Sequence, residues 1–191
     1  MLASGLHSSK SASNDRADRS AHTYTRGSWT TPEAAHPDRD QGSTDYVAAG
    51  VVTSTTYLKW ALLFEEPDNR TVWLAKALPR DWLAPGAEEV VVEDATTRYG
   101  RLSYRLDAKM TAGAYTVSAN VSLPPSYAES PPTGGLRLRL RAPLPHGGKL
   151  KAVTVDGKPW AAIDAKAETV DFSAAALKAA PKLGSIMATF G

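Results

Sequence analysis

The chain has 191 residues, of which 42% are hydrophobic and 22% charged, and this composition indicates a soluble globular protein rather than a disordered one. Its formal net charge of +2 is too small to indicate a nucleic acid or an anionic membrane as a partner. The absence of cysteine excludes disulfides, thiolate metal ligands and a cysteine nucleophile. No apolar run is long enough to span a bilayer.

The chain opens with two segments that show no regular period. Residues 1–23 are rich in Ser, Ala, Asp and Arg and are predicted to be disordered. They lack the apolar segment of a signal peptide, so nothing in them directs the chain to secretion, and the compartment stays open. Residues 24–44 contain two prolines and two glycines and are predicted to form an irregular but ordered loop, which carries Trp29, Glu33 and His36.

A long helix is predicted next. Thr44 or Asp45 can cap it, and Glu65-Glu66-Pro67 ends it. The β-branched residues from Val51 to Thr56 lower its intrinsic stability, so it needs tertiary packing to persist. Its apolar residues occupy more than one face, which indicates that other helices enclose it. The chain itself supplies no such helices.

From Val72 onward the apolar residues recur with the period of two that is typical of strands. Asp156-Gly157 is predicted to be a hairpin turn, and Ala174 to Lys178 to form one helical turn. Short strands separated by Gly and Pro turns favour an antiparallel β-sandwich. The fold class is therefore mainly β, an antiparallel β-sandwich preceded by a loop and one long helix. The predicted strands are 72–76, 88–93, 100–107, 114–123, 136–142, 150–155, 168–172 and 185–190.

The segment from Leu136 to Arg141 alternates leucine and arginine, which places three of each on opposite faces of a strand. One interpretation is a strip of arginines that binds an anionic polymer. The other is a solvated polar face with the leucines in the sandwich core, which is the common arrangement in antiparallel sheets.

The tryptophans could either stack on sugar rings or fill the core, because indole offers both a flat face and a large apolar area. Trp60 and Trp73 lie in apolar segments and are expected in the core. Trp82 lies in a polar turn, where the two interpretations are balanced. Trp160 stays open between them.

Glu33 and His36, with the nearby Asp38 and Asp40, form a short acidic cluster with one imidazole. Carboxylates in a loop can act as a general base or bind a cation. An ordinary solvated loop is the alternative. The spacing matches no metal loop, and there is no Gly-rich phosphate loop or nucleophile elbow, so the sequence implies neither a metal nor a cofactor.

Several segments follow one another in an order that is more specific than any one of them. They are Tyr57-Leu58-Lys59-Trp60, Val72-Trp73-Leu74, Pro79-Arg80-Asp81-Trp82-Leu83 with Gly86, Thr97-Arg98-Tyr99-Gly100-Arg101-Leu102-Ser103, and the later hairpin Val153-Thr154-Val155-Asp156-Gly157-Lys158-Pro159-Trp160. This order resembles the end of the catalytic barrel and the start of the C-terminal β-domain in six-hairpin glycosidases, which are built on an (α/α)6 barrel. Within these enzymes, the order resembles that of the alpha-L-rhamnosidase-like group.

The resemblance implies a domain organisation and a parent activity. Residues 1–23 would be a disordered N-terminus, 24–71 the loop and last helix of a barrel, and 72–191 a C-terminal β-sandwich domain. The parent would hydrolyse glycosidic bonds in carbohydrate metabolism with two carboxyl groups and water. The chain would then be a fragment whose barrel domain is missing, and it is expected to be inactive alone.

The resemblance also implies site residues. In the rhamnosidase-like group the general base is a glutamate in a tryptophan-containing loop before the last hairpin, and the matching region is Trp29-Thr30-Thr31-Pro32-Glu33. Glu33 is therefore the sole catalytic candidate, although in the family pattern the glutamate directly follows the tryptophan. Trp29, His36 and Trp82 are the candidate contacts to a carbohydrate substrate or ligand.

Two alternatives remain beside the glycoside hydrolase fragment. One is a non-catalytic carbohydrate-binding or structural β-sandwich module with a helical extension. The other is a protein–protein module that uses the apolar helix.

Overall fold

The computed structural model describes residues 48–111, 114–143, 148–179 and 183–191. The predictions for residues 1–23, for the loop 24–44 and for the cap at Thr44 or Asp45 lie outside the described residues. Within those residues, no helix is both long and apolar enough to cross a membrane. The described strands all belong to the second of two compact units, Lys59–Gly191.

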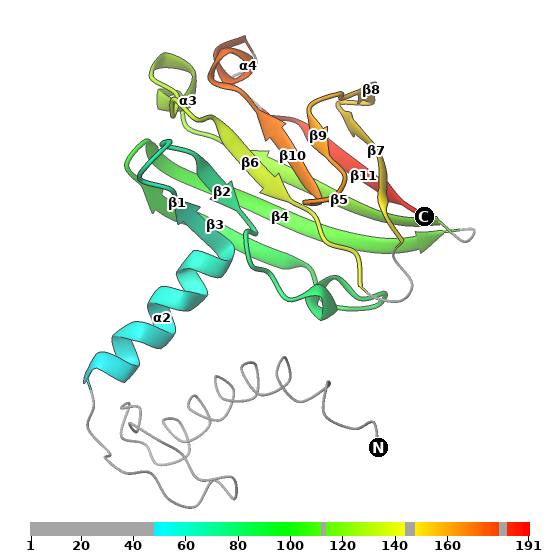
Figure 1. The fold of residues 1–191 in the computed structure, drawn as a ribbon, viewed down its shortest axis with the longest axis horizontal. Coiled ribbons are helices and arrows are strands. Elements are labelled where there is room, and N and C mark those ends of the chain that lie inside the picture. Colours follow the sequence, from blue (N-terminus) through cyan, green and yellow to red (C-terminus); the bar gives the residue numbers. More distant parts are fainter. Residues whose placement is uncertain (1–47, 112–113, 144–147, 180–182) are drawn as a thin grey trace, which may run out of the picture. The chain divides into compact units, whose positions relative to one another are not determined.

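The strands form two sheets, which are seen as two layers in Figure 1. All neighbouring strands run antiparallel except β2 and β6, which are parallel. The five-stranded sheet has the order β1 (Leu63–Glu65), β2 (Val72–Leu74), β6 (Leu136–Arg139), β10 (Thr169–Phe172) and β9 (Ile163–Asp164). The six-stranded sheet has the order β3 (Val90–Thr97), β4 (Gly100–Thr111), β5 (Ala114–Ser122), β11 (Ser185–Phe190), β7 (Leu150–Val155) and β8 (Lys158–Pro159).

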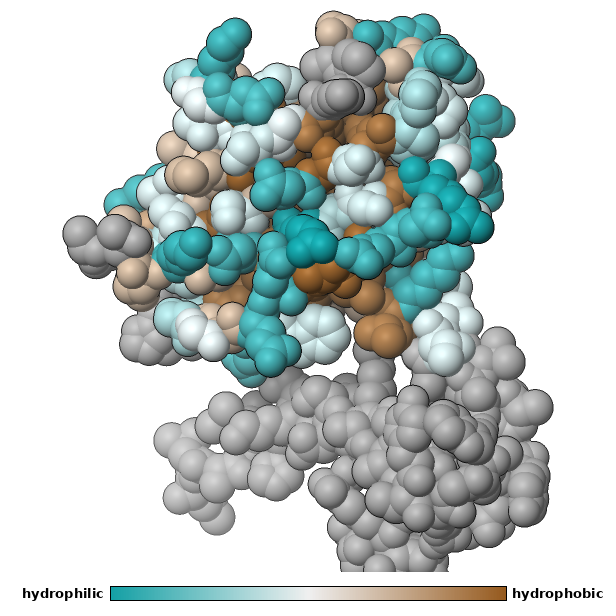
Figure 2. Space-filling view, turned by 180° about the vertical axis from the view of Figure 1, so that it is seen from behind, coloured by the Kyte–Doolittle hydropathy of each residue, from teal (hydrophilic) through white to brown (hydrophobic). Residues whose placement is uncertain are grey.

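One hydrophobic core lies between the two sheets. Alternate residues of β5, β6 and β11 are buried, as a period of two requires. The core joins residues of both sheets, such as Leu138 and Phe172 of one and Val117 and Phe190 of the other. Hydrophilic side chains cover much of the face seen in Figure 2, with apolar ones visible between them. The predicted mainly β sandwich is confirmed.

The observed helix ends earlier than the sequence predicted. Helix α2 spans Ala48–Leu62, and Leu63–Glu65 is already strand β1, which pairs with β2. The two last helical carbonyls are satisfied outside the helix: the Ala77 N–H donates to Ala61 O (3.1 Å) and the Ala75 N–H to Leu62 O (2.7 Å). The prediction that the helix ends at Glu65-Glu66-Pro67 is therefore wrong, and the sandwich begins at Leu63.

The shorter elements agree with the turn chemistry of the sequence. Asp156 and Gly157 both have positive φ (50° and 73°) and connect β7 to β8, which confirms the predicted hairpin turn. Helix α4 spans Ala174–Ala179 and confirms the predicted helical turn, whereas helix α3 (Ser126–Glu129) was not predicted.

A short connection crosses from one sheet to the other and contains the 3-10 helix η1 (Arg80–Leu83). Arg80 makes a two-pronged ion pair with Glu168, with its Nη1 2.8 Å from Oε1 and its Nη2 2.6 Å from Oε2. Arg80 Nη1 also donates to Ala142 O (2.6 Å), and Tyr115 Oη donates to Leu83 O. These bonds fix η1 against both sheets.

The Arg80–Glu168 pair predicts a large stability cost when one partner is removed. The Glu168 side chain is only 10% exposed. Without Arg80 it keeps only the longer contact to Arg141 Nε (3.7 Å), and loss of the main partner of a buried charge costs about 3 kcal/mol. We expect Arg80→Ala to lower the free energy of unfolding in urea by about this amount. Arg101→Ala is the matched control, because the side chains of the Arg101–Asp94 pair are 64% and 68% exposed, and its cost should stay below about 1 kcal/mol. Equal costs for the two variants would contradict this assignment.

Buried phenols predict a loss of stability at high pH. Burial raises the pKa of Tyr127 to about 12, whereas an unfolded tyrosine titrates near pH 10. Above pH 10 the unfolded chain therefore releases a proton that the folded chain retains, and stability falls by about 1.4 kcal/mol per pH unit for this group until the folded pKa is reached. Urea unfolding between pH 9 and 11.5 should show a shallower decline for Tyr127→Phe. An unchanged decline in that variant would be evidence against a buried, protonated phenol.

Candidate functional site

Of the four predicted site residues, the structure places one. Trp82 lies on η1, and its side chain is 42% exposed. Trp29, Glu33 and His36 lie outside the described residues, so Glu33 as general base and the other two as substrate contacts stay predictions. The site is therefore built around Trp82.

The geometry of η1 turns Trp82 outward. Pro79 precedes the helix, and the Trp82 N–H donates to Pro79 O (3.2 Å). In a 3-10 helix residues three apart lie on one face, so Arg80 and Leu83 share the inward side, where Leu83 is buried. Trp82 falls on a different side of the same turn, and its indole stays exposed.

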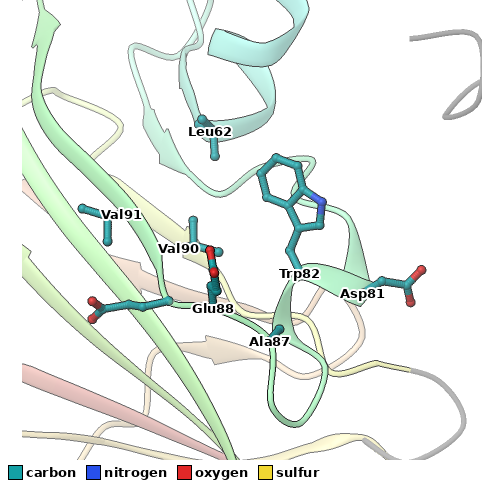
Figure 3. A pocket seen from close by; sticks show the side chains of 8 residues that line it. Leu62, Asp81, Trp82, Ala87, Glu88, Val90 and Val91 are labelled. Atoms are coloured by element: carbon teal, nitrogen blue, oxygen red, sulfur yellow. The ribbon is translucent and has the colours of Figure 1, made fainter. Parts of the chain in front are cut away.

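A groove of about 470 Å³ lies beside the Trp82 indole. Figure 3 shows Leu62, Val90 and Glu88 on one side of the indole and Asp81 pointing away on the other side. The lining residues come from three places in the chain: the end of α2, the turn η1, and the start of β3. They are Leu62, Asp81, Trp82, Ala87, Glu88, Glu89, Val90 and Val91.

The rim of the groove is acidic. Glu89 pairs with Arg105 (3.2 Å), which also pairs with Glu93 (2.7 Å). Asp81 and Glu88 have no ion-pair partner among the described residues. The groove thus combines the apolar side chains of Leu62, Val90 and Val91 with the Trp82 indole. The Glu88 carboxylate remains available there to accept hydrogen bonds.

Two other tryptophans are not in the core, contrary to prediction. Trp60 is 46% exposed and meets Phe64 edge to face, with ring centroids 5.9 Å apart. Trp73 is half-buried because its neighbours Val72 and Leu74 both face inward, which turns it to the outer face of the five-stranded sheet.

The Trp73 ring is already covered. Its Nε1 donates to Glu66 Oε2 (2.9 Å), and the Arg137 guanidinium carbon and the Lys76 Nζ lie 4.8 and 5.0 Å from the ring centroid. The Trp73 hydrogen bond lowers the pKa of Glu66 and keeps that carboxylate charged. These contacts leave Trp73 a poor platform for a sugar ring.

Trp160 has a structural role. Its Nε1 donates to Asp171 O (3.1 Å), and its ring lies 5.0 Å from that of Phe172. The half-buried indole therefore packs against the core edge. Among the four tryptophans of the described residues, Trp82 is the one that lines the groove.

The leucine–arginine segment has its leucines in the core, as one of the two interpretations predicted: Leu136, Leu138 and Leu140 are buried. The arginines are not simply solvated, however. Arg137 makes a two-pronged ion pair with Asp171 (2.7 and 2.9 Å), and Arg139 and Arg141 are half-buried and donate to backbone carbonyls. Binding of an anionic polymer stays a prediction.

The groove residues Leu62, Glu88 and Glu89 were not predicted as site residues. Leu62 belongs to the end of a helix whose boundary was misplaced, and the Glu pair carries no motif. The available signal was the turn residue Gly86 (φ 81°), which directs the chain back toward Trp82. Within the described ranges, no group of three or more His, Cys, Asp or Glu residues could hold a metal ion.

Comparison of the chain with models of known protein families, with curated proteins and with solved structures found no match in any of the three. The functional argument therefore rests on the residues and geometry of the groove.

Proposed function

We propose that the chain is the C-terminal part of a glycoside hydrolase, and that its β-sandwich is a non-catalytic module that contacts carbohydrate through the Trp82 groove. The observation that supports this proposal is an exposed indole that lines the same groove as the Glu88 carboxylate. The flat indole face suits the C–H face of a sugar ring, and the carboxylate accepts hydrogen bonds from sugar hydroxyls.

The arrangement of carboxylates favours binding over hydrolysis in this groove. Hydrolysis of a glycosidic bond needs two carboxyl groups that flank the bond. Here Asp81 points away from the groove (Figure 3), and Glu89 is paired with Arg105. Glu88 is left without a second carboxylate opposite it, so the groove holds a ligand without cleaving it.

The hydrolase parent is supported by the join between helix and sandwich. Helix α2 passes into β1 without an intervening residue, since Leu62 is the last helical residue and Leu63 the first of the strand. The short strand and proline-led turn follow in the order that six-hairpin glycosidases have. In the proposed parent, Glu33 is the general base, and the barrel supplies the general acid.

Carbohydrate binding through the groove predicts a specific effect of Trp82→Ala. Affinity electrophoresis through gels that contain different polysaccharides should show retardation of the unaltered chain on at least one of them. Trp82→Ala should weaken this retardation at least about tenfold, which corresponds to about 1.4 kcal/mol. Met187→Ala is the matched control, because Met187 is an exposed apolar residue (47%) of β11 that does not line the groove. Absence of retardation on every polysaccharide would leave the sandwich a structural module.

The parent activity predicts a second effect. In a longer protein that contains this chain and hydrolyses a glycoside, Glu33→Gln should abolish turnover, because an amide cannot activate water as a general base. The substitution preserves the size of the side chain, and substrate binding should change little. Unchanged turnover would remove Glu33 from the catalytic site.

A further inference from the structure

Beside the end of β6, two guanidinium groups contact one carboxylate, and the charge of a third arginine acts on one of them. Arg80 comes from η1, Arg139 ends β6, Arg141 follows two residues later, and Glu168 directly precedes β10. Arg80 occupies both oxygens of Glu168, while Arg141 Nε lies 3.7 Å from Glu168 Oε2. These four side chains, Arg80, Arg139, Arg141 and Glu168, form the arginine cluster.

The donors of the cluster are only partly satisfied. Arg139 donates from Nε to Ala167 O (3.0 Å) and from Nη1 to Lys76 O (3.2 Å). Arg141 donates from Nη1 to Leu78 O at a long 3.4 Å, and its buried Nε has no hydrogen-bond partner among the described residues. Carbonyl oxygens accept hydrogen bonds but carry no net charge, so these contacts do not neutralise Arg139 or Arg141.

The cluster carries an excess of positive charge where solvent reaches it only in part. The Arg80 and Arg141 side chains are 24% and 26% exposed. Burial, together with the charges of Arg80 and Arg139, lowers the pKa of Arg141, and Glu168 offsets only part of this effect. A guanidinium remains charged at any physiological pH. Loss of a proton therefore cannot relieve the repulsion, whereas a bound anion would.

Arg137, which lies on β6 like Arg139, differs from the arginines of the cluster because its charge is neutralised. It has its own carboxylate, Asp171, which binds it through both oxygens. Arg139 and Arg141 have no carboxylate of their own among the described residues. The unbalanced charge is thus confined to the end of β6, where Arg139 is the last strand residue and Arg141 follows two residues later.

We propose that Arg139 and Arg141, with Arg80 held beside them by Glu168, form a binding site for an oxyanion carried by an acidic saccharide, a uronate carboxylate or a sulfate ester. Two neighbouring guanidinium forks match the paired oxygens of such a group. The saccharide part of this inference rests on the proposed carbohydrate-binding function. The oxyanion part rests on the arginine cluster alone.

Calorimetry at constant ionic strength tests the site with three probes: inorganic sulfate, an oligogalacturonide, and a sulfated oligosaccharide. The unaltered chain should bind sulfate and should bind at least one acidic saccharide more tightly. Arg141→Gln should weaken all such binding at least tenfold, and Arg141→Lys should restore it only in part. Arg101→Gln, which removes an exposed arginine of the other sheet, should bind as the unaltered chain does.

Each result then decides one part of the proposal. Urea unfolding of Arg141→Gln shows whether the variant is folded, and Arg139→Gln replaces it if it is not. No binding of any probe by the unaltered chain, or equal binding by Arg141→Gln, overturns the oxyanion site. Sulfate binding without tighter saccharide binding overturns only the saccharide assignment. Retardation on neutral polysaccharides and its dependence on Trp82 test the proposed function separately.

Discussion

The ion pair between Arg80 and Glu168 is the contact on which both candidate sites depend. It ties the connection between the sheets to the residue that precedes β10, and the same arginine satisfies the carbonyl of Ala142. Removing two charges from water is costly, so a pair of this kind contributes little net stability by itself. Its contribution is geometric, because it holds η1, and with it the backbone of Trp82, against the five-stranded sheet.

The sandwich is also closed by contacts from the end of α2. Leu62 O accepts hydrogen bonds from the Ala75 N–H and from Tyr104 Oη of the other sheet (2.9 Å). Helix carbonyls at a C-terminus lack partners within the helix, and here the strands supply them. Glu65 of β1 extends this connection, because it accepts from the Arg98 N–H (2.9 Å) in the turn between β3 and β4. The last turn of the helix is thus part of the sandwich, and Leu62 can line the groove.

The sequence could predict those features that depend on neighbours along the chain. Alternation located eight of the eleven described strands, and Asp156-Gly157 located a hairpin, because both signals are local. Strand β1 was missed because Leu63-Phe64-Glu65 continues the apolar pattern of the helix, and its strand form depends on pairing with β2. Trp73 was misplaced because two buried neighbours, and not its own apolarity, decide its side of the sheet.

The candidate sites were harder to predict, since they join distant positions. No residue near Glu168 in the sequence indicates that Glu168 would form an ion pair with Arg80, which lies 88 residues earlier in the chain. Which arginine of the Leu136–Arg141 segment would be neutralised is equally a tertiary outcome: Asp171 faces Arg137 across the ladder, whereas Arg139 faces Thr169. Only Trp82, in a polar turn, carried a local signal of exposure.

The 3-10 helix η1 carries one residue of each candidate site, Arg80 of the arginine cluster and Trp82 of the groove, on different sides of one turn. Each residue advances the helix by about 120°, so Arg80 and Leu83 face inward while Trp82 faces the groove. An α-helical turn, at about 100° per residue, would not align Arg80 with Leu83. Because the two sides of η1 are fixed by one short turn, a ligand at the arginine cluster and one at the groove would share a support but no side chain. A single turn thus accounts for two chemically different surfaces, one cationic and one aromatic with an acidic rim.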